Sequence, residues 1–478
     1  MSHLPGVPKG GRPTSGASSG AVLVAATRHP APPLAGGGEL MTTPLLSPAR
    51  VPMALQSLWA QRRLGALLDQ ATSAAALGKT AATSSCAVVA QDGRVIFSDG
   101  AGRAVAPASN MKLVTAWVLL NKLGPGYRFT TKVVATSRPQ DGVLRGNLYF
   151  VGGGDPLLRL PSYVASLEDA GTVFTNVTQL PGLIKAAGVE RVAGSVVGDD
   201  LRYDSLRTIP SWPPSYEAEG DVGPLSALGI DDGNATAQPL VPAGAPPALE
   251  SAGVLTQLLD EAGVTVGGAP LLGAAPSGAY VVASLVSPPL SQVLKEVFWE
   301  SDNTAMELMT KELGLKEYGS GSTAAGARAV RADLAEHGFP LTKFVNVDGS
   351  GLSHHDRVTC ALLLSVLERS GPQSVLTQDL PVAGESGTLS EEMKGTIAEG
   401  RVEAKTGTLD GVKALSGWVM PVPGEAPGDP YLSAPVVFSL VLNGLPSSDA
   451  DPAALTDRFA VDVAEYPQAP ALALFEPS

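Results

Sequence analysis

The chain has 478 residues, which is enough for two or three domains with sizeable hydrophobic cores. It contains 54 glycines and 40 prolines, few aromatic residues, and a net charge of −13 without a run of basic residues. This charge pattern excludes the usual electrostatic signature of nucleic-acid binding. No stretch of the sequence is long and apolar enough to span a membrane.

Residues 1–50 do not show the pattern of a packed domain, because Gly, Pro, Ser and Ala dominate and no hydrophobic period is sustained. Lys9 and Arg12 precede an apolar run, but residues 21–26 are short for the hydrophobic part of a signal peptide, and Arg28 follows soon after. We expect a disordered tail or a degenerate export signal, and a misassigned start codon explains the same pattern.

The remaining elements fall into three blocks. The first predicts a helix over 55–68, a hairpin of strands 86–90 and 94–97 with an Asp-Gly turn, and a helix from Ser109 to Gly124. The second predicts short strands at 130–135, 144–151 and 192–197, with a helical segment near Ser162. The third predicts helices at 290–299, 304–313, 324–337 and 358–368, strands at 402–409, 412–420 and 436–442, and a helix at 453–465.

Two cysteines are present, Cys86 in a predicted strand and Cys360 in a predicted helix. They have no metal-binding spacing and allow one disulfide. We expect two unpaired, buried thiols instead, since free cysteine behaves as a small apolar residue.

Ser109 and Lys112 lie three residues apart at a predicted helix start, so their side chains share one face of the helix. A serine hydroxyl beside a lysine amine is a nucleophile with its base. Two further motifs follow: Ser301-Asp302-Asn303 between two predicted helices and Lys405-Thr406-Gly407 in a predicted strand.

Each motif also has a plain structural interpretation. The Ser301-Asp302-Asn303 loop suits a helix N-cap, Lys405 suits an exposed edge strand, and Lys112 suits an exposed helix surface. The three motifs together, in this order and in these contexts, favour the catalytic interpretation.

The triple resembles the active-site set of penicillin-binding proteins and serine β-lactamases. Other segments resemble the type-C low-molecular-mass group, the D-alanyl-D-alanine carboxypeptidase/endopeptidases, over about residues 50–470. These segments are GNLYFVGGGDPL at 146–157, VGDDL at 197–201, DGSGLS at 348–353 and LPVAGESGTL at 380–389. The resemblance implies a mixed α/β fold, with a β-lactamase/transpeptidase-like domain of helices packed on an antiparallel sheet.

The family interrupts this catalytic domain with inserted material after the nucleophile helix. We therefore expect residues 51–128 and 287–478 to form the discontinuous catalytic domain and residues 129–286 to form an inserted, mainly β domain. The gap between Ser109 and Ser301 is shorter than in members with two inserted domains. The missing length falls around Asp232 to Glu250, where only a Pro/Ala-rich stretch remains, so we expect the further inserted domain to be absent or vestigial.

The resemblance implies a serine-type D-Ala-D-Ala carboxypeptidase, and also a D,D-endopeptidase, that acts on peptidoglycan stem peptides. It implies β-lactam antibiotics as covalent inhibitors and neither a metal nor another cofactor. It leaves the oligomeric state open. Because peptidoglycan lies outside the cytoplasmic membrane, we expect an extracytoplasmic protein, at the cell wall or on the periplasmic side.

The roles of the side chains follow from their chemistry. Ser109 attacks the carbonyl between two D-alanines, and Lys112 takes its proton, so burial and the nearby Lys405 must lower the pKa of Lys112. Ser301 suits a proton relay to the leaving amine, and Asn303 suits a hydrogen bond to Lys112 and the substrate amide. Lys405, Thr406 and Thr408 suit the terminal carboxylate of the substrate, and Gly407 is expected to bind the substrate with them. The resemblance implies an oxyanion hole from the N–H groups of Ser109 and Thr408.

Three other functions fit the sequence less well. A class A β-lactamase needs a deacylating Glu in an E-x-x-x-N loop between the second and third motifs. The only asparagine between Asn303 and Lys405 is Asn346, and the residue four positions before it is Thr342, so this loop is absent. A serine–histidine hydrolase has only the Gly16–Gly20 G-x-S-x-G, which lies in the tail. A non-catalytic peptidoglycan-binding module with a relic site would need a broken triad, and none of the three motifs is broken.

The most detailed prediction concerns specificity for the third residue of the stem peptide. The resemblance gives Asp155 the role of binding the ammonium of diaminopimelate, whereas the family's carboxylate-binding arginine is replaced by His354, with Arg357 three residues later. Asp410 adds a second carboxylate. The alternative is that His354 and Asp410 are solvated loop residues. We expect a pocket that requires an ammonium and gains little from a carboxylate on the substrate.

Overall fold

The computed structural model describes residues 50–167, 173–237, 240–242, 244–421, 434–446 and 453–466. All of them belong to one compact unit, residues 48–478. The tail predicted over residues 1–50 lies outside the described residues, except for Arg50 at the start of helix α1. Among the described helices, none has both the length and the apolar character that a bilayer span requires.

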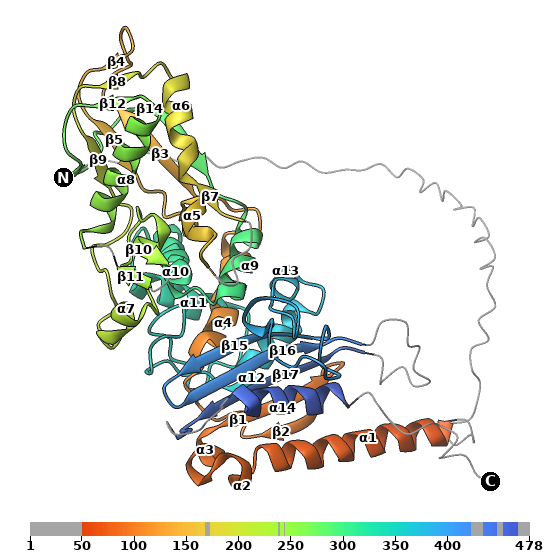
Figure 1. Ribbon diagram of the computed structural model, residues 1–478. Helices are drawn as coiled ribbons and strands as arrows, with labels where there is room; N and C mark the ends of the chain where they lie inside the picture. The colour runs from red at the N-terminus through yellow and green to blue at the C-terminus, as the bar shows by residue number, and fades with distance from the viewer. Residues whose placement is uncertain are drawn as a thin grey trace, which may run out of the picture. The chain divides into compact units, whose positions relative to one another are not determined.

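A five-stranded antiparallel sheet brings the early and late parts of the chain together (Figure 1). Its order is β15-β16-β17-β1-β2, so the hairpin of the first block lies beside the last strand. The strands are β1 (Cys86–Gln91), β2 (Arg94–Asp99), β15 (Val402–Leu409), β16 (Val412–Val419) and β17 (Val436–Asn443). Asp92 and Gly93 both have positive φ, as the predicted Asp-Gly turn requires.

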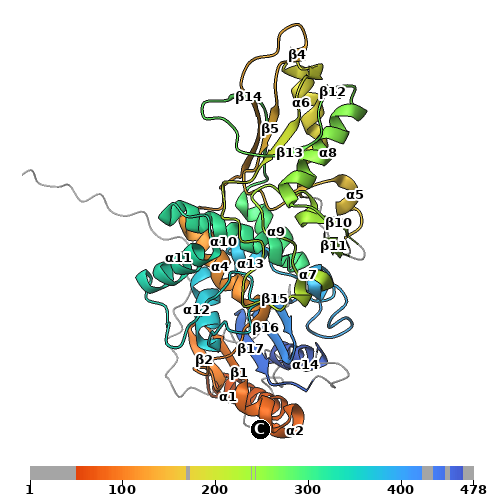
Figure 2. The same ribbon diagram turned by 90° about the vertical axis from the view of Figure 1, so that its left-hand side faces the viewer.

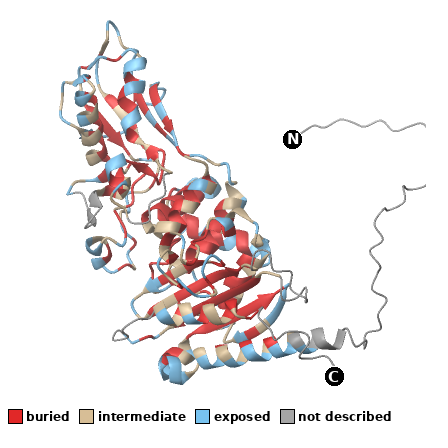
Figure 3. Ribbon diagram, turned by 45° about the vertical axis from the view of Figure 1, so that its right-hand side comes forward, coloured by how far each residue is buried: buried red, intermediate tan, exposed pale blue. Residues whose placement is uncertain are grey.

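Helices cover both faces of this sheet, as the alternation in β17 shows. Val437 and Val441 face one hydrophobic cluster, whereas Phe438 and Leu440 face the other. The second cluster is covered by α1 (Arg50–Ala71) and α14 (Ala453–Ala464), with the short α2 (Ala74–Leu77) and α3 (Lys79–Ser84) between α1 and β1. Figure 3 shows the buried residues concentrated between these layers.

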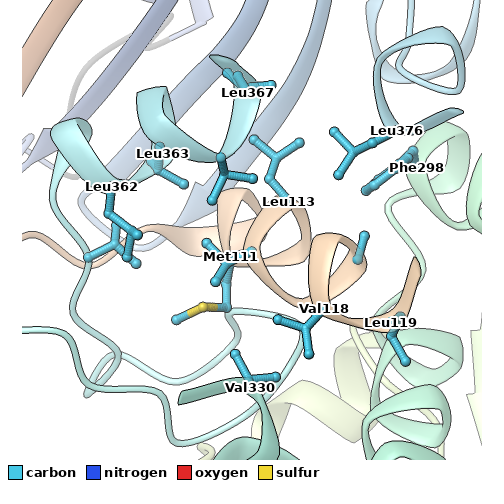
Figure 4. Close-up of a cluster of buried hydrophobic side chains, with 14 of the residues drawn as sticks. Met111, Leu113, Val118, Leu119, Phe298, Val330, Leu362, Leu363, Leu367 and Leu376 are labelled. Atoms are coloured by element: carbon cyan, nitrogen blue, oxygen red, sulfur yellow. The ribbon is translucent and has the colours of Figure 1, made fainter. Parts of the chain in front are cut away.

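The first cluster holds the helix that carries the predicted nucleophile. Met111, Leu113 and Val118 of α4 (Met111–Lys122) pack against side chains from the surrounding helices (Figure 4). The helices on this side are α9 (Leu290–Glu300), α10 (Asn303–Tyr318), α11 (Thr323–Glu336), α12 (Cys360–Ser370) and α13 (Val375–Gln378). A 3-10 turn, η1 (Ala108–Asn110), leads into α4, and another, η4 (Gly387–Leu389), precedes β15.

A second five-stranded sheet, of order β13-β9-β5-β3-β14, lies within residues 130–286 (Figure 2). Its strands are β3 (Thr130–Ala135), β5 (Leu148–Val151), β9 (Val196–Asp199), β13 (Leu271–Leu272) and β14 (Tyr280–Val286). A small parallel sheet contains β4 (Val143–Leu144), β8 (Arg191–Val192) and β12 (Thr265–Val266). Two-stranded pairs are β6 (Leu158–Arg159) with β7 (Thr175–Asn176) and β10 (Asn234–Ala237) with β11 (Leu240–Pro242).

Helices accompany these strands, chiefly α6 (Leu180–Ala186) and α8 (Pro247–Glu261). The short ones are α5 (Pro161–Val164), η2 (Val177–Gln179), α7 (Ser215–Glu219) and η3 (Asp231–Gly233). The 15-residue α8 begins inside the stretch that the sequence suggested was only a Pro/Ala-rich remnant. Proline suits its first turn, and Ala248, Ala252 and Leu255 bury one face against the sheet.

Two of the predicted strands are each divided between two sheets. The run 144–151 becomes β4 and β5, and the run 192–197 becomes β8 and β9. Gly146 has φ +110, and a Cβ on Gly194 would lie 2.6 Å from the Gly146 carbonyl oxygen. The chain crosses from one sheet to the other at these two glycines: Gly146 has a φ that disfavours a side chain, and Gly194 has no room for one.

The two cysteines form a disulfide between the start of β1 and the start of α12, with Cα atoms 5.9 Å apart. The prediction of two unpaired thiols is therefore wrong. The residues are 274 positions apart in sequence, and only the placement of β1 inside the sheet brings them together.

Candidate active site

The predicted nucleophile Ser109 lies in η1, immediately before α4. The preceding residue, Ala108, has φ +49, a left-handed conformation that costs energy for a residue with a side chain. Gly351 packs against this turn, since a Cβ there would lie 1.9 Å from the Ala108 carbonyl oxygen. Tight packing therefore fixes the strained turn that presents Ser109.

Lys112 is fully buried, and its amine contacts three oxygen atoms. Nζ lies 2.9 Å from Ser109 Oγ, 2.5 Å from Asn303 Oδ1 and 3.1 Å from the Ser350 carbonyl oxygen. The helix spacing predicted from sequence thus places the amine on the serine hydroxyl. The alternative of an exposed helix lysine is wrong.

The Ser301-Asp302-Asn303 loop joins α9 to α10, and each of its three residues makes different contacts. Asp302 accepts a hydrogen bond from Ala305 N at 2.8 Å, so this residue does cap the helix. Asn303 binds Lys112 through Oδ1 and donates from Nδ2 to the Asp221 carbonyl oxygen at 2.7 Å. Ser301 has φ +55 at the end of α9 and lines the cavity described below.

β15 is an edge strand, and η1 lies beside it. Asn110 Nδ2 donates to the Lys405 carbonyl oxygen at 3.0 Å. A Cβ on Gly407 would lie 3.1 Å from both Asn110 Nδ2 and the Pro107 carbonyl oxygen, so glycine allows this close approach. The strand therefore sits next to the nucleophile turn at Gly407.

The Lys405 side chain is fully buried, so the alternative of a solvated edge lysine is wrong. Its Nζ donates to the Thr406 carbonyl oxygen at 3.0 Å and to Thr406 Oγ1 at 3.3 Å. Thr388 Oγ1, from η4, lies 2.8 Å from Thr406 Oγ1. An amine and two hydroxyls thus meet at one point, a suitable set of donors for a carboxylate.

A cavity of about 810 Å³ connects these motifs. The predicted site residues in its lining are Ser109, Ser301, Asn303, Thr406, Gly407, Thr408 and Asp410. Lys112 and Lys405 lie beneath this surface, in hydrogen-bond contact with lining residues. Asp155 and His354 are not among the described lining residues. Asp155 is buried and accepts from Leu157 N at 3.0 Å, and His354 carries its carbonyl oxygen 2.6 Å from Arg357 Nη1.

The electrostatics of the two lysines differ from those of surface lysines. Burial lowers the pKa of Lys112 to about 8, against the attraction of Asp302, Asp348 and Glu307 for its charged form. Burial, and then repulsion from Lys112, lower the pKa of Lys405. A fraction of Lys112 is therefore neutral near neutral pH, as a general base requires.

A second buried cation, Arg159, contacts the Ser301-Asp302-Asn303 loop through Asp302, whereas Lys112 contacts it through Asn303. Its guanidinium pairs with Asp302 at 2.7 Å, Asp232 at 3.0 Å and Glu300 at 3.1 Å. Burial raises the pKa of Glu300 to about 7 and that of Asp232 to about 8. All three carboxylates line the cavity.

Several of these groups have no local sequence signal. Arg159 is far in sequence from its three acidic partners. The contacts of Asp221 with Asn303 and of Thr388 with Thr406 also join separate segments that only the fold brings together. The sequence gives a partial signal for the buried charged residues of α10. Its periodicity predicts a core helix, and a charged residue inside such a helix is a candidate for burial.

A serine presented by a strained turn, a buried lysine in contact with its hydroxyl and an edge strand with donors suited to a carboxylate lie around one cavity. This arrangement is typical of serine acyl enzymes of the penicillin-binding class. Comparison with known proteins gives the family. The profile of the D-Ala-D-Ala carboxypeptidase 3 (S13) family matches residues 65–249 and 234–465, and the chain belongs to this family. It is a serine peptidase, as the three motifs predicted.

Curated relatives agree. The chain is 32% identical to a D-alanyl-D-alanine carboxypeptidase of Actinomadura sp. (strain R39), over 78% of this chain and 79% of that protein. It is 31% identical to carboxypeptidase Rv3627c of Mycobacterium tuberculosis, over 65% and 67%. Among solved structures, penicillin binding protein 4 (dacB) of Haemophilus influenzae matches with a TM-score of 0.68 at 21% identity, over 84% of this chain and 98% of that one. The last match confirms the predicted fold class.

Proposed function

We propose that this protein removes the terminal D-alanine from peptidoglycan stem peptides through an acyl-enzyme on Ser109. The single observation that supports this most is the contact of 2.9 Å between Lys112 Nζ and Ser109 Oγ at the wall of a cavity whose edge strand presents Lys405 and Thr406. A terminal carboxylate on that strand would hold the scissile amide over the serine.

The reaction then follows from the side chains. Ser109 gives its proton to the lone pair of neutral Lys112, and Oγ bonds to the carbonyl carbon between the two D-alanines. The N–H groups of Ser109 and Thr408 stabilise the oxyanion. A proton passes back through Ser301 to the leaving amine as the C–N bond breaks, and D-alanine departs. Water then attacks the acyl ester by the same route and releases the shortened peptide.

β-Lactams fit the same proposal, because their strained amide is an acyl donor that carries a carboxylate. Lys405, Thr406 and Thr408 would bind that carboxylate, and Ser109 would open the ring. The acyl group then remains on Ser109, so the antibiotic acts as a covalent inhibitor. A D,D-endopeptidase activity on cross-linked peptides uses the same chemistry with a larger leaving amine.

The cavity lining favours a cationic group on the substrate. Besides the three acidic residues that pair with Arg159, its acidic residues are Glu219, Asp221, Glu392, Asp410 and Asp457, whereas Lys413 is the basic residue among the described lining residues. We infer that an ammonium on the third stem residue is preferred. Asp410, which lines the cavity, is a better candidate to bind it than Asp155, which is buried outside the lining. The Arg357 side chain donates to the carbonyl oxygens of His354 and Asp356, which supports little gain from a substrate carboxylate.

An extracytoplasmic location is part of the proposal, because the substrate is found there. The Cys86–Cys360 disulfide supports it, since such bonds persist mainly in oxidising compartments. The domain division remains a proposal as well: residues 51–128 and 287–478 for catalysis and residues 129–286 for the insertion. The two separate five-stranded sheets support this division.

Two assays test the function. Peptides ending in D-Ala-D-Ala should release D-alanine with the native enzyme and not with Ser109→Ala, and cross-linked muropeptides should be cut as well. No release by folded native protein would overturn the proposal. For the third residue, lysine, N-acetyl-lysine and diaminopimelate peptides are compared with Asp410→Asn and Asp155→Asn. Equal cleavage of lysine and N-acetyl-lysine would remove the ammonium pocket from the account.

A further inference from the structure

Glu307 is a fully buried carboxyl that the reaction outlined above does not use. It lies four residues after Asn303 on α10, so the two side chains share one face of that helix. Asn303 contacts the Lys112 amine directly. Glu307 contacts the next segment behind it, the loop 348–353 that also reaches Lys112.

The backbone of this loop is divided between two carboxyl groups. Glu307 Oε1 accepts from Gly349 N at 2.8 Å and from Ser350 N at 2.7 Å. Asp348 accepts from Gly351 N and Ser353 N, both at 2.7 Å. Four peptide N–H groups of one short loop therefore point at two buried side chains.

The carbonyl groups of the same loop point toward α4. The Gly349 carbonyl oxygen accepts from Thr115 Oγ1 at 2.8 Å, and the Ser350 carbonyl oxygen accepts from Lys112 Nζ at 3.1 Å. Gly349 has no room for a side chain, since a Cβ would lie 1.9 Å from Thr310 Oγ1. The loop is thus held from one side by Glu307 and presents an acceptor to the catalytic amine on the other.

That acceptor matters because a neutral amine has two N–H donors and one lone pair. Asn303 is committed as an acceptor toward Lys112, because its Nδ2 donates to the Asp221 carbonyl oxygen. The Ser350 carbonyl oxygen can only accept. When these two oxygens take both N–H groups of neutral Lys112, the lone pair is left for Ser109, the one remaining partner and the one that can donate.

We propose that Glu307 is a positioning residue for the general base: by holding the Gly349 and Ser350 peptides, it directs the Ser350 carbonyl at Lys112 and so turns the lone pair of the amine toward Ser109. This inference rests on the proposed function of the site. It adds a residue that touches neither substrate nor nucleophile but acts through the loop and through its charge.

The charge of Glu307 works on the same amine. Lys112 is faced by Glu307 and Asp302 from α10 and its cap, by Asp348 from the loop and by Lys405 from β15. Glu307 itself is faced by Asp348, Asp356 and Lys112. Burial raises the pKa of Glu307 to about 7, so its negative charge appears near neutral pH and favours the charged form of Lys112.

The informative variant is Glu307→Gln. Both peptide N–H groups bind a single oxygen, Oε1, which glutamine keeps, and Oε2 lies 3.5 Å from Thr323 Oγ1, where an amide N–H can donate. Glutamine should therefore hold the loop without the charge. The midpoint of the acid limb of benzylpenicillin acylation, measured as kinact/KI against pH, should move to lower pH by roughly 0.5–1 unit.

Glu307→Ala removes both hydrogen bonds and should lower kinact/KI at its optimum by roughly 10–100-fold. Glu312→Gln is the matched control: it is a buried carboxylate on the same helix that binds Arg202 and Tyr203 instead of the loop, and its pH midpoint should equal that of the native enzyme. An unshifted midpoint in Glu307→Gln, together with an unchanged kinact/KI in Glu307→Ala, would overturn the proposal. Failure of the native enzyme to react at all would instead overturn the proposed function.

Discussion

Two buried cations stand on opposite sides of the Ser301-Asp302-Asn303 loop, and the protein treats them in opposite ways. Asn303 faces Lys112 with a neutral oxygen, whereas Asp302 faces Arg159 with a carboxylate. Arg159 has two more carboxylate partners, and these ion pairs hold its pKa above the usual value despite burial. Lys112 makes its hydrogen bonds to neutral oxygens, and burial lowers its pKa to about 8.

The difference shows how adjacent residues can serve stability and chemistry separately. A guanidinium keeps its proton and forms directed pairs, so it suits a permanent charge that locks three acidic segments together. An amine loses its proton readily when it is desolvated, so it suits a base. The comparison predicts that damage on one side appears as lost reactivity and damage on the other as lost stability.

The largest expected effect is that of Lys112→Met. It removes the proposed base while keeping an apolar side chain of similar length, so acylation by benzylpenicillin should fall by about 10³-fold or more, ~4 kcal/mol in the barrier. The rate is measured by the appearance of the penicilloyl mass. Thermal unfolding serves as the control, because a folded variant should show no loss of stability. Substantial acylation in this variant would show that another group acts as the base.

Arg159→Met should act on the opposite property. It leaves Asp232, Glu300 and Asp302 buried without their shared cation, which should cost about 3–5 kcal/mol in the free energy of unfolding. Urea unfolding measures this. The fraction that stays folded should lose less acylation rate than Lys112→Met does. A stability equal to that of the native protein would contradict the structural role given to Arg159.

The pH dependence of stability should also separate the two sites. Below pH 8 Lys112 is charged in both folded and unfolded states, and the cost of burying that charge is fully present. Between about 8 and 10.5 only the unfolded state holds the proton, so stability relative to Lys112→Met should rise by ~1.4 kcal/mol per pH unit, about 3 kcal/mol in all. The measurement is urea unfolding of both proteins across this range, and a constant difference would mean that Lys112 is not desolvated.

Tyr163→Phe is the smallest of these changes. The hydroxyl donates to Asp232 Oδ2 at 3.2 Å, next to Arg159, so its loss should cost about 1 kcal/mol of stability. The same substitution made in Arg159→Met measures whether the tyrosine acts within the cluster. An equal cost in both backgrounds would show that it acts independently.

Much of the fold follows from local patterns. β3 and β15 have the predicted bounds, because β-branched runs between Gly or Pro residues mark strand ends clearly. α8 was not predicted, although Pro247 and the apolar spacing of Ala248, Ala252 and Leu255 signal a helix, because it begins in a Pro/Ala-rich stretch that was interpreted as the remnant of a missing domain. The divided strands were missed because crossing between sheets depends on tertiary pairing.

In the candidate site, too, contacts within one helix could be predicted and contacts between distant segments could not. Ser109 and Lys112 are three residues apart on one helix, so local geometry predicts their contact. Arg159 and Glu307 could not be assigned, because their partners come from segments that only the fold brings together. The cysteine pair failed for the same reason: the neighbourhood of β1 and α12 depends on the order of the sheet.

The most direct test of the central claim is the rate at which benzylpenicillin labels Ser109 in the native protein from about pH 6 to about pH 9, with the labelled residue identified by peptide mass. The account predicts a label on Ser109 and a rate that rises about tenfold per pH unit at low pH, with a midpoint near 8 set by the neutral form of Lys112. A label on another residue, or a rate that stays constant across this range, would contradict it.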